Sequence, residues 1–295
     1  MEHQFKLPNE TNGNEESARR ASDLIEEIRA DIDFELDDAV TDIVRDLPEE
    51  YFQRMNHENQ VTHLKGLIAT RICQLKGELF IPSADGSQIA VLGRKSYRGQ
   101  LAYILSELPG KKTRLVGANI YTARSHGFIL DVFEFDSDQR PVSEASFSGE
   151  VIAKLVQQTG SSEEEITEFL SRIRTTIVIS PNPEKLSRFF KAFKLIKAGQ
   201  PVVVDRGDSS GDLVVAVRSP SERSTFQRTS ESLSALSLDI EQAELIVVRF
   251  DKAADEPEDK RSDKVVLMNF VVSGSNVGPF EVEAWADGLV AGLAE

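Results

Sequence analysis

Few side chains in this 295-residue sequence have the type and spacing that chemistry requires. His126 and Asp131 lie in the segment RLVGANIYTARSHGFILDVFEFD and could be read as a base and an acid. Because a strand rises about 3.3 Å per residue, their side chains would lie about 15 Å apart, too far for a catalytic pair. We therefore expect His126 to be a turn residue and Asp131 to make a structural hydrogen bond.

The remaining candidates for chemistry are one cysteine and two histidines. Cys73 cannot form an intramolecular disulfide, and its apolar helical context predicts a buried core residue. His57 and His63 are six residues apart, so they do not share a helix face as a zinc-binding pair would. No GxGxxG, GxxxxGK[ST], HExxH, GxSxG or CxxC motif is present. We expect no catalytic centre, metal site or cofactor on this chain.

The composition favours an ordinary soluble globular protein. The chain is 40% hydrophobic and 28% charged, and its net charge is −15. Between Glu15 and Glu50, fourteen acidic residues oppose four basic ones, which should repel nucleic acid. No apolar run approaches the ~18–20 residues that span a bilayer, and the N-terminus has no apolar signal segment. With a single cysteine, these features predict a cytoplasmic protein without nucleic-acid or membrane partners.

Along the chain, the hydrophobic pattern first predicts helices and then a repeated unit of strands and helices. Apolar residues at helical spacing cover residues 25–47, and a second helix is expected from Asn56 or His57 to Leu75. The order β–α–β–β then occurs twice. The first copy has strands at 88–93, 114–122 and 127–135 and a helix at 99–108; the second has strands at 212–218, 243–250 and 264–273 and a helix at 224–236.

These patterns predict an α+β fold, with an N-terminal helical segment followed by two tandem ferredoxin-like modules. Further helices are expected at 161–173, where SSEEE provides a cap and first-turn acids, and at 184–197, with a short strand at 176–179 between them. The expected organisation is a disordered N-terminus (1–20), an acidic helical segment (21–81), a first module (86–180), a second module (184–275) and a C-terminal tail (276–295).

A family resemblance rests on three strings. GANIYTARSHGFILDVFEF, preceded by GQLAYILSELPG and a strand, resembles an ACT domain, a small βαββαβ unit that binds amino acids or mediates subunit contacts. The ACT pair of the bacterial nitrogen-sensing uridylyltransferase is similar. The ACT-like N-terminal region of the large NAD-specific glutamate dehydrogenases is similar too, and LPEEYFQ at Leu47–Gln53, followed by His63–Leu64, favours this second relative.

The resemblance implies a regulatory or assembly region of an NAD-dependent glutamate dehydrogenase, which deaminates glutamate oxidatively to 2-oxoglutarate. This chain would have no activity by itself, NAD would bind only to a catalytic domain not present on it, and the tail would be a linker to that domain. The alternatives are a stand-alone amino-acid sensor and a purely structural oligomerisation module. The implied partners are an amino-acid effector and a second ACT sheet, either in a homo-oligomer or within the chain.

The resemblance also implies where an effector would bind. In ACT modules the effector sits at the junction of two modules, near the loop between the first strand and the first helix. Backbone N–H groups at a helix start, with Arg94 and Arg98, would favour a carboxylate, although a solvated basic loop is an equal alternative. The effector-binding candidates are Gly93, Arg94, Lys95, Ser96, Tyr97, Arg98 and Gly99.

Overall fold

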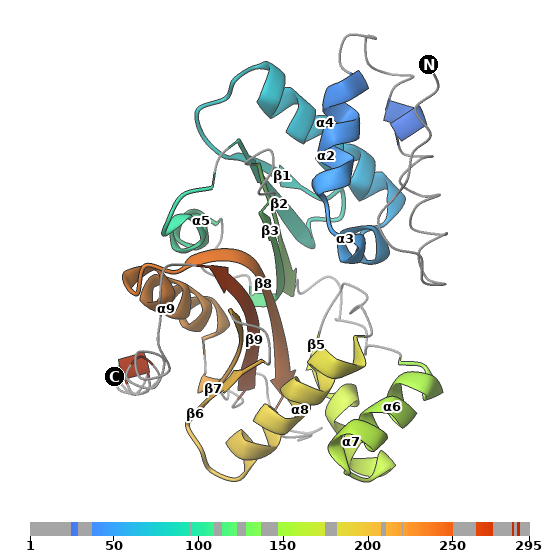
Figure 1. The fold of residues 1–295 in the computed structure, drawn as a ribbon, viewed down its shortest axis with the longest axis vertical. Coiled ribbons are helices and arrows are strands. Elements are labelled where there is room, and N and C mark those ends of the chain that lie inside the picture. Colours follow the sequence, from blue (N-terminus) through green and yellow to red (C-terminus); the bar gives the residue numbers. More distant parts are fainter. Residues whose placement is uncertain are drawn as a thin grey trace.

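The computed structural model has a mixed α/β fold in which helices cover both faces of one antiparallel sheet (Figure 1). The sheet joins residues from both halves of the chain, so the two expected modules share one layer of strands. The structure describes residues 25–28, 37–94, 96–108, 114–122, 128–136, 147–174, 182–207, 211–219, 221–249, 264–273, 285 and 288–289.

Nine strands in the described residues form the sheet. They are β1 (Leu79–Pro82), β2 (Gln88–Gly93), β3 (Arg114–Thr122), β4 (Ile129–Asp136), β5 (Ile173–Arg174), β6 (Val202–Arg206), β7 (Asp212–Ser219), β8 (Asp239–Arg249) and β9 (Lys264–Ser273). Their order is β1-β2-β4-β3-β8-β9-β7-β6, with β5 beside β8, and every pair is antiparallel. The valine-rich central strands are almost fully buried, as expected for strands covered on both faces.

The helices divide between the two faces of the sheet. They are α2 (Asp37–Asp46), α3 (Glu49–Arg54), α4 (His57–Ile72), α5 (Gln100–Glu107), α6 (Gly149–Thr159), α7 (Glu163–Ser171), α8 (Pro183–Lys197) and α9 (Glu222–Ala235). One core lies between the sheet and the pair α5 and α9. On the opposite face, α2–α4 cover the first half and α6–α8 cover the second (Figure 1).

Local sequence signals explain where several helices begin. The predicted SSEEE start is confirmed: Ser162 accepts a hydrogen bond from the backbone N–H of Glu165, and three glutamates occupy the first turn of α7. Asn56 caps α4 in the same way, and Asn182 caps α8, where Pro183 takes the first helical position. These caps satisfy N–H groups that have no partner within the helix.

The two halves are related by an approximate two-fold symmetry. In β2-α5-β3-β4 and in β7-α9-β8-β9, the third strand lies between the first and the second. Both second strands carry a bulge, at Val116 in β3 and at Glu241 in β8, an offset of 125 residues. The same offset carries Asn119 onto Glu244, and these two residues lie directly opposite each other where β3 pairs with β8. The symmetry axis therefore passes through this pair.

Two expectations from the sequence were wrong. Cys73 is exposed, because α4 ends at Ile72 and Gln74 adopts a φ of +49°, which turns the chain away from the core. The boundary expected after residue 81 falls inside β1, which was not predicted and which pairs with β2. The strand expected at 176–179 and the N-terminus (1–20) lie outside the described residues, as does most of the tail.

Candidate functional site

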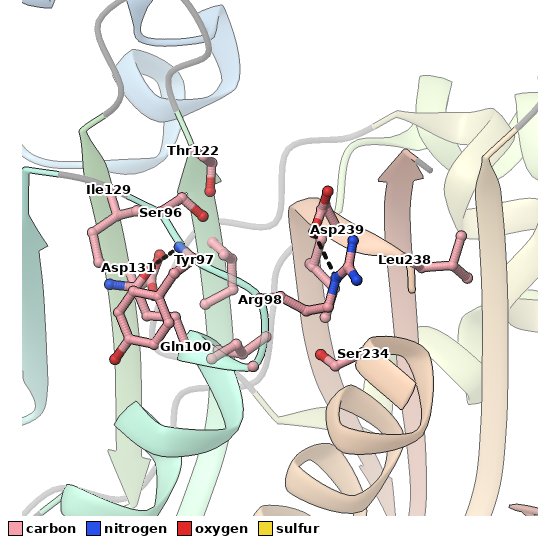
Figure 2. Close-up of a pocket in the computed structure, with 14 residues that line it drawn as sticks. Ser96, Tyr97, Arg98, Gln100, Thr122, Ile129, Asp131, Ser234, Leu238 and Asp239 are labelled. Atoms are coloured by element: carbon pink, nitrogen blue, oxygen red, sulfur yellow. Dashed lines mark hydrogen bonds and ion pairs between the residues drawn. The ribbon is translucent and has the colours of Figure 1, made fainter. Parts of the chain in front are cut away.

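A shallow pocket opens where the two halves meet, on the face that carries α5 and α9 (Figure 2). It has a volume of about 410 Å³, part of which is open to solvent. Its walls come from the loop before α5, the adjoining parts of β3 and β4, the last turn of α9 and the start of β8. Residues that are more than 100 positions apart in the sequence therefore form one site.

The structure brings together part of the expected effector loop. Four of the seven candidate residues line the pocket, namely Ser96, Tyr97, Arg98 and Gly99. Gly93 does not line it; this glycine ends β2 and packs so closely that a Cβ atom would lie 2.8 Å from the side chain of Ile129. Arg94 is exposed and outside the lining, and Lys95 lies outside the described residues.

Hydrogen bonds hold this loop against the first half. The backbone N–H of Tyr97 donates to Oε1 of Gln100 over 3.3 Å. The Gln100 amide and the Tyr97 hydroxyl both donate to the Glu78 carboxylate, over 3.1 and 3.3 Å. Gly99 has a φ of +82°, a conformation that glycine adopts without strain, and it begins α5. The loop position is thus set by its own side chains and by the segment before β1.

Across the pocket, Arg98 reaches the second half. Its Nε donates to Oδ1 of Asp239, at the start of β8, over 3.2 Å. The two side chains are 49% and 55% exposed, so the pair contributes little to stability. Within the described residues this is the one polar contact of the Arg98 guanidinium, and it leaves both Nη groups facing solvent or a ligand.

Asp131 lines the opposite side of the pocket, on β4 (Figure 2). It is only 3% exposed, and its cross-strand neighbours are Val91 and Ile120. The backbone N–H of Tyr121 donates to its carboxylate, as the sequence led us to expect, but Oδ1 has no hydrogen-bond partner in the described part of the chain. Burial raises the pKa of Asp131 well above its ordinary value of 3.8, and the charge of Glu78 raises it further.

Asp131 is the residue that sequence reasoning left out of the site. The available signal was a single acid between Ile129 and Phe133 on an inward-facing strand surface. Its place beside the loop at 96–99 depends on how distant strands pair, which the local pattern does not reveal.

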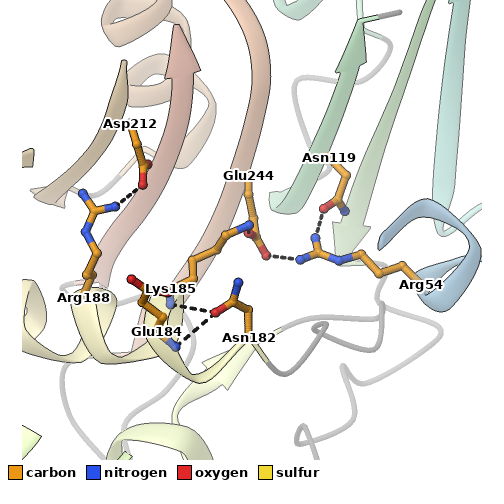
Figure 3. A network of polar contacts seen from close by, with 8 residues as sticks. All are labelled: Arg54, Asn119, Asn182, Glu184, Lys185, Arg188, Asp212 and Glu244. Atoms are coloured by element: carbon orange, nitrogen blue, oxygen red, sulfur yellow. Dashed lines mark hydrogen bonds and ion pairs between the residues drawn. The ribbon is translucent and has the colours of Figure 1, made fainter. Parts of the chain in front are cut away.

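A second polar cluster lies on the other face of the sheet, around the symmetry axis (Figure 3). Arg54 of α3 pairs with Glu244 over 2.8 Å and donates to Asn119, and Lys185 of α8 pairs with Glu244 over 3.0 Å. Burial alone would raise the pKa of Glu244, but the charges of Arg54 and Lys185 lower it below its ordinary value. Because Arg54 and Lys185 both contact the one carboxylate of Glu244, we interpret this cluster as a structural tie that holds α3 and α8 to the sheet.

The two histidines that the structure describes, His57 and His63, do not form a site together. Nδ1 of His63 lies 3.2 Å from the Tyr51 hydroxyl, and burial lowers its pKa from 6.5 to about 4. His57 instead pairs with Glu27 over 2.5 Å, and His126 lies outside the described residues. The parts of the chain that the structure describes contain no group of three His, Cys, Asp or Glu side chains able to hold a metal ion. Within the same ranges, no helix combines the length and apolar character needed to cross a bilayer.

No protein-family model matches this sequence, and a comparison with curated proteins finds no similar one.

Proposed function

We propose that this chain is the regulatory, ACT-like N-terminal region of a large NAD-specific glutamate dehydrogenase. Its two halves would be ferredoxin-like modules, and oxidative deamination of glutamate with NAD would belong to a separate catalytic domain. The resemblance of Gly99–Phe135 and Leu47–Gln53 supports this proposal. The arrangement first-third-second strand, repeated in both halves, is typical of ferredoxin-like units and supports it independently.

The observation that carries the proposal is the pocket at the seam between the halves. Its rim includes the loop that the resemblance implies as the effector site. Arg98 lies on one side of it and the buried carboxylate of Asp131 on the other (Figure 2). Convergent polar groups of opposite charge in a concave site are suited to a small zwitterionic ligand. We propose that an amino acid binds here and biases how the two halves sit against each other.

The pairing of β3 with β8 supports intramolecular contact between the two modules, because each supplies its second strand to the other. The same observation favours a second candidate function, a purely structural module without a ligand. In that case the seam would serve only to hold the sheet together. The two functions differ in whether any small molecule binds the pocket.

Calorimetric titration of the chain with the twenty amino acids and with 2-oxoglutarate tests the proposal. We expect saturable heat with at least one amino acid, and we expect Arg98→Glu to abolish it. Arg94→Glu is the matched control, because Arg94 belongs to the same loop but lies outside the pocket and should leave binding unchanged. If no ligand produces heat, the effector role is rejected and the structural role is favoured.

A further inference from the structure

We propose that Asp131 recognises the ammonium group of the ligand, so that the pocket selects amino acids over the corresponding 2-oxo acids. This inference rests on the proposed effector role of the pocket and adds the residue that would select the amino acid over its 2-oxo counterpart. The observation behind it is the buried carboxylate of Asp131, for which the described residues provide no cationic partner.

Asp131 is a buried acid that has no cationic partner among the described residues. The carboxylate is buried between Val91 and Ile120 and faces the pocket, and no cation among the described residues contacts it. A buried acceptor left without a partner destabilises a protein, because its lost hydration is not replaced. An ammonium group carries three donors on a compact charge and could satisfy Oδ1 without displacing the backbone bond from Tyr121.

The second half shows that the fold does not require an acid at this position. Asp131 pairs across the sheet with Val91 and Ile120, and Met268 pairs in the same way with Val215 and Leu245. The symmetry therefore places Met268 where the first half has Asp131. Met268 is completely buried in the same core. An apolar side chain thus fills this position well, so a structural need does not explain the carboxylate.

The other end of the pocket offers a place for a carboxylate. Helix α5 begins at Gln100 with no acidic residue in its first turn and no side-chain cap, so its positive end is not neutralised locally. Arg98 adds a guanidinium with two uncommitted Nη groups. At the equivalent first position of α9 stands Glu222, a buried acid that pairs with Lys264. The first half alone combines an open cationic end with a buried acid, as an α-amino acid requires.

Ammonium binding should also release a proton. Burial holds the pKa of Asp131 above its ordinary value, so in the empty pocket the neutral carboxyl form is favoured more than in an exposed aspartate. A bound ammonium favours the carboxylate and expels that proton. The titratable and charged groups that border the site and would contribute to this response are Glu78, Tyr97, Arg98 and Asp239.

The test is calorimetry with matched pairs, such as glutamate with 2-oxoglutarate and alanine with pyruvate. For wild-type protein we expect the amino acid to bind at least about tenfold more tightly than its 2-oxo partner, since a charge-assisted hydrogen bond contributes about 1.5–3 kcal/mol. Asp131→Asn should lower amino-acid affinity by at least about tenfold and leave 2-oxo acid affinity unchanged. Asp239→Asn, at an exposed acid of the same pocket, is the control that should keep the preference.

The outcomes distinguish a failure of the Asp131 inference from a failure of the proposed effector function. If 2-oxo acids bind wild-type protein as tightly as amino acids, or if Asp131→Asn keeps the preference, this inference is overturned while the effector role survives. If neither class binds, the proposed function fails together with it. Titration of wild-type protein in buffers of different ionisation enthalpy needs no variant; an amino acid that binds without proton release would also count against the inference.

Discussion

The two halves of the molecule share one scaffold but differ at equivalent positions on the α5/α9 face. Where the second half has Met268, the first has Asp131, and where α9 begins with Glu222 paired to Lys264, α5 begins with Gln100. In the second half the buried acid at the start of α9 pairs with Lys264. In the first half, Oδ1 of the buried Asp131 has no hydrogen-bond partner among the described residues, and the first turn of α5 has no acid. In terms of the proposed function, the second half has filled with an apolar side chain the position that the proposed site uses in the first half.

The seam between α5 and α9 differs in the same way at its two ends. At the C-terminal end of α5, Arg223 donates three hydrogen bonds, to the carbonyl oxygens of Leu105 (2.7 Å), Leu108 (3.0 Å) and Ser106 (3.1 Å). At the C-terminal end of α9, the exposed Arg98–Asp239 pair spans the gap. The seam is thus closed by three hydrogen bonds of the partly buried Arg223 at one end and bridged only by an exposed ion pair at the other.

The largest expected effect comes from giving the second half the acid of the first. Met268→Asp should destabilise the protein by at least about 4 kcal/mol, because it removes a buried side chain and leaves a carboxylate among apolar neighbours. The free energy of unfolding from urea denaturation measures this. Met268→Leu is the control and should change stability by less than about 1.5 kcal/mol. If Met268→Asp changes stability by less than about 1 kcal/mol, the two positions do not differ as we argue.

A smaller loss is expected where the seam is closed. Arg223→Ala should lower the free energy of unfolding by about 2–3 kcal/mol, since three carbonyl oxygens lose a charged donor. Arg98→Ala, the counterpart at the open end, should change it by less than about 0.5 kcal/mol. Parallel thermal and urea denaturation of both variants compares the two ends. Equal losses in the free energy of unfolding would mean that the two ends of the seam contribute equally to stability.

The reverse exchange should stabilise the first half. Leu has the same number and branching of side-chain heavy atoms as Asp, although its methyl groups are bulkier than carboxylate oxygens, so Asp131→Leu removes the unpartnered carboxylate and keeps the branched shape of the side chain. We expect a gain of about 1–3 kcal/mol in the free energy of unfolding, together with loss of amino-acid binding. A variant that is less stable than wild type by more than about 1 kcal/mol would show that the acid has a structural role.

The smallest effect is how that gain varies with pH. In the folded state Asp131 has a raised pKa, so between 3.8 and that value the folded protein holds more protons than the unfolded chain. The contribution of Asp131 to stability is therefore most favourable below about pH 3.8 and is lost as the pH rises. The advantage of Asp131→Leu over wild type should grow from pH 4 to pH 8 in urea denaturation. An advantage that shrinks over this range would contradict a raised pKa.

Much of the fold could be predicted because its signals are local. The apolar runs at 88–93 and 264–273 and the SSEEE cap correspond to β2, β9 and α7. β1 was missed because four residues ending in a proline give no alternating pattern. The end of α4 was placed too late, since the apolar spacing continues to Leu75 although Gln74 adopts a positive φ.

The candidate site could be predicted only in part, for a related reason. The loop at 96–99 is a sequence-local feature, and it was identified. The role of Asp131 depends on β8 and α9, which are more than 90 residues away in the sequence, and on the absence of a cation beside it. Pairing between β3 and β8 likewise joins residues about 125 positions apart, and the pattern of a single strand does not specify its neighbour.

The pair on the symmetry axis has a consequence for self-recognition. Asn119 faces Glu244, so the axis brings together two unlike residues. If two separate copies of the second half met through β8 in this register, Glu244 would face Glu244, and like charges directly opposite each other repel. Arg54, one of the two cations that pair with Glu244 in the intact chain, belongs to the first half and would be missing, so that each Glu244 would keep only Lys185. One position in each strand thus acts against pairing of β8 with a second β8 and favours the union of two unlike halves.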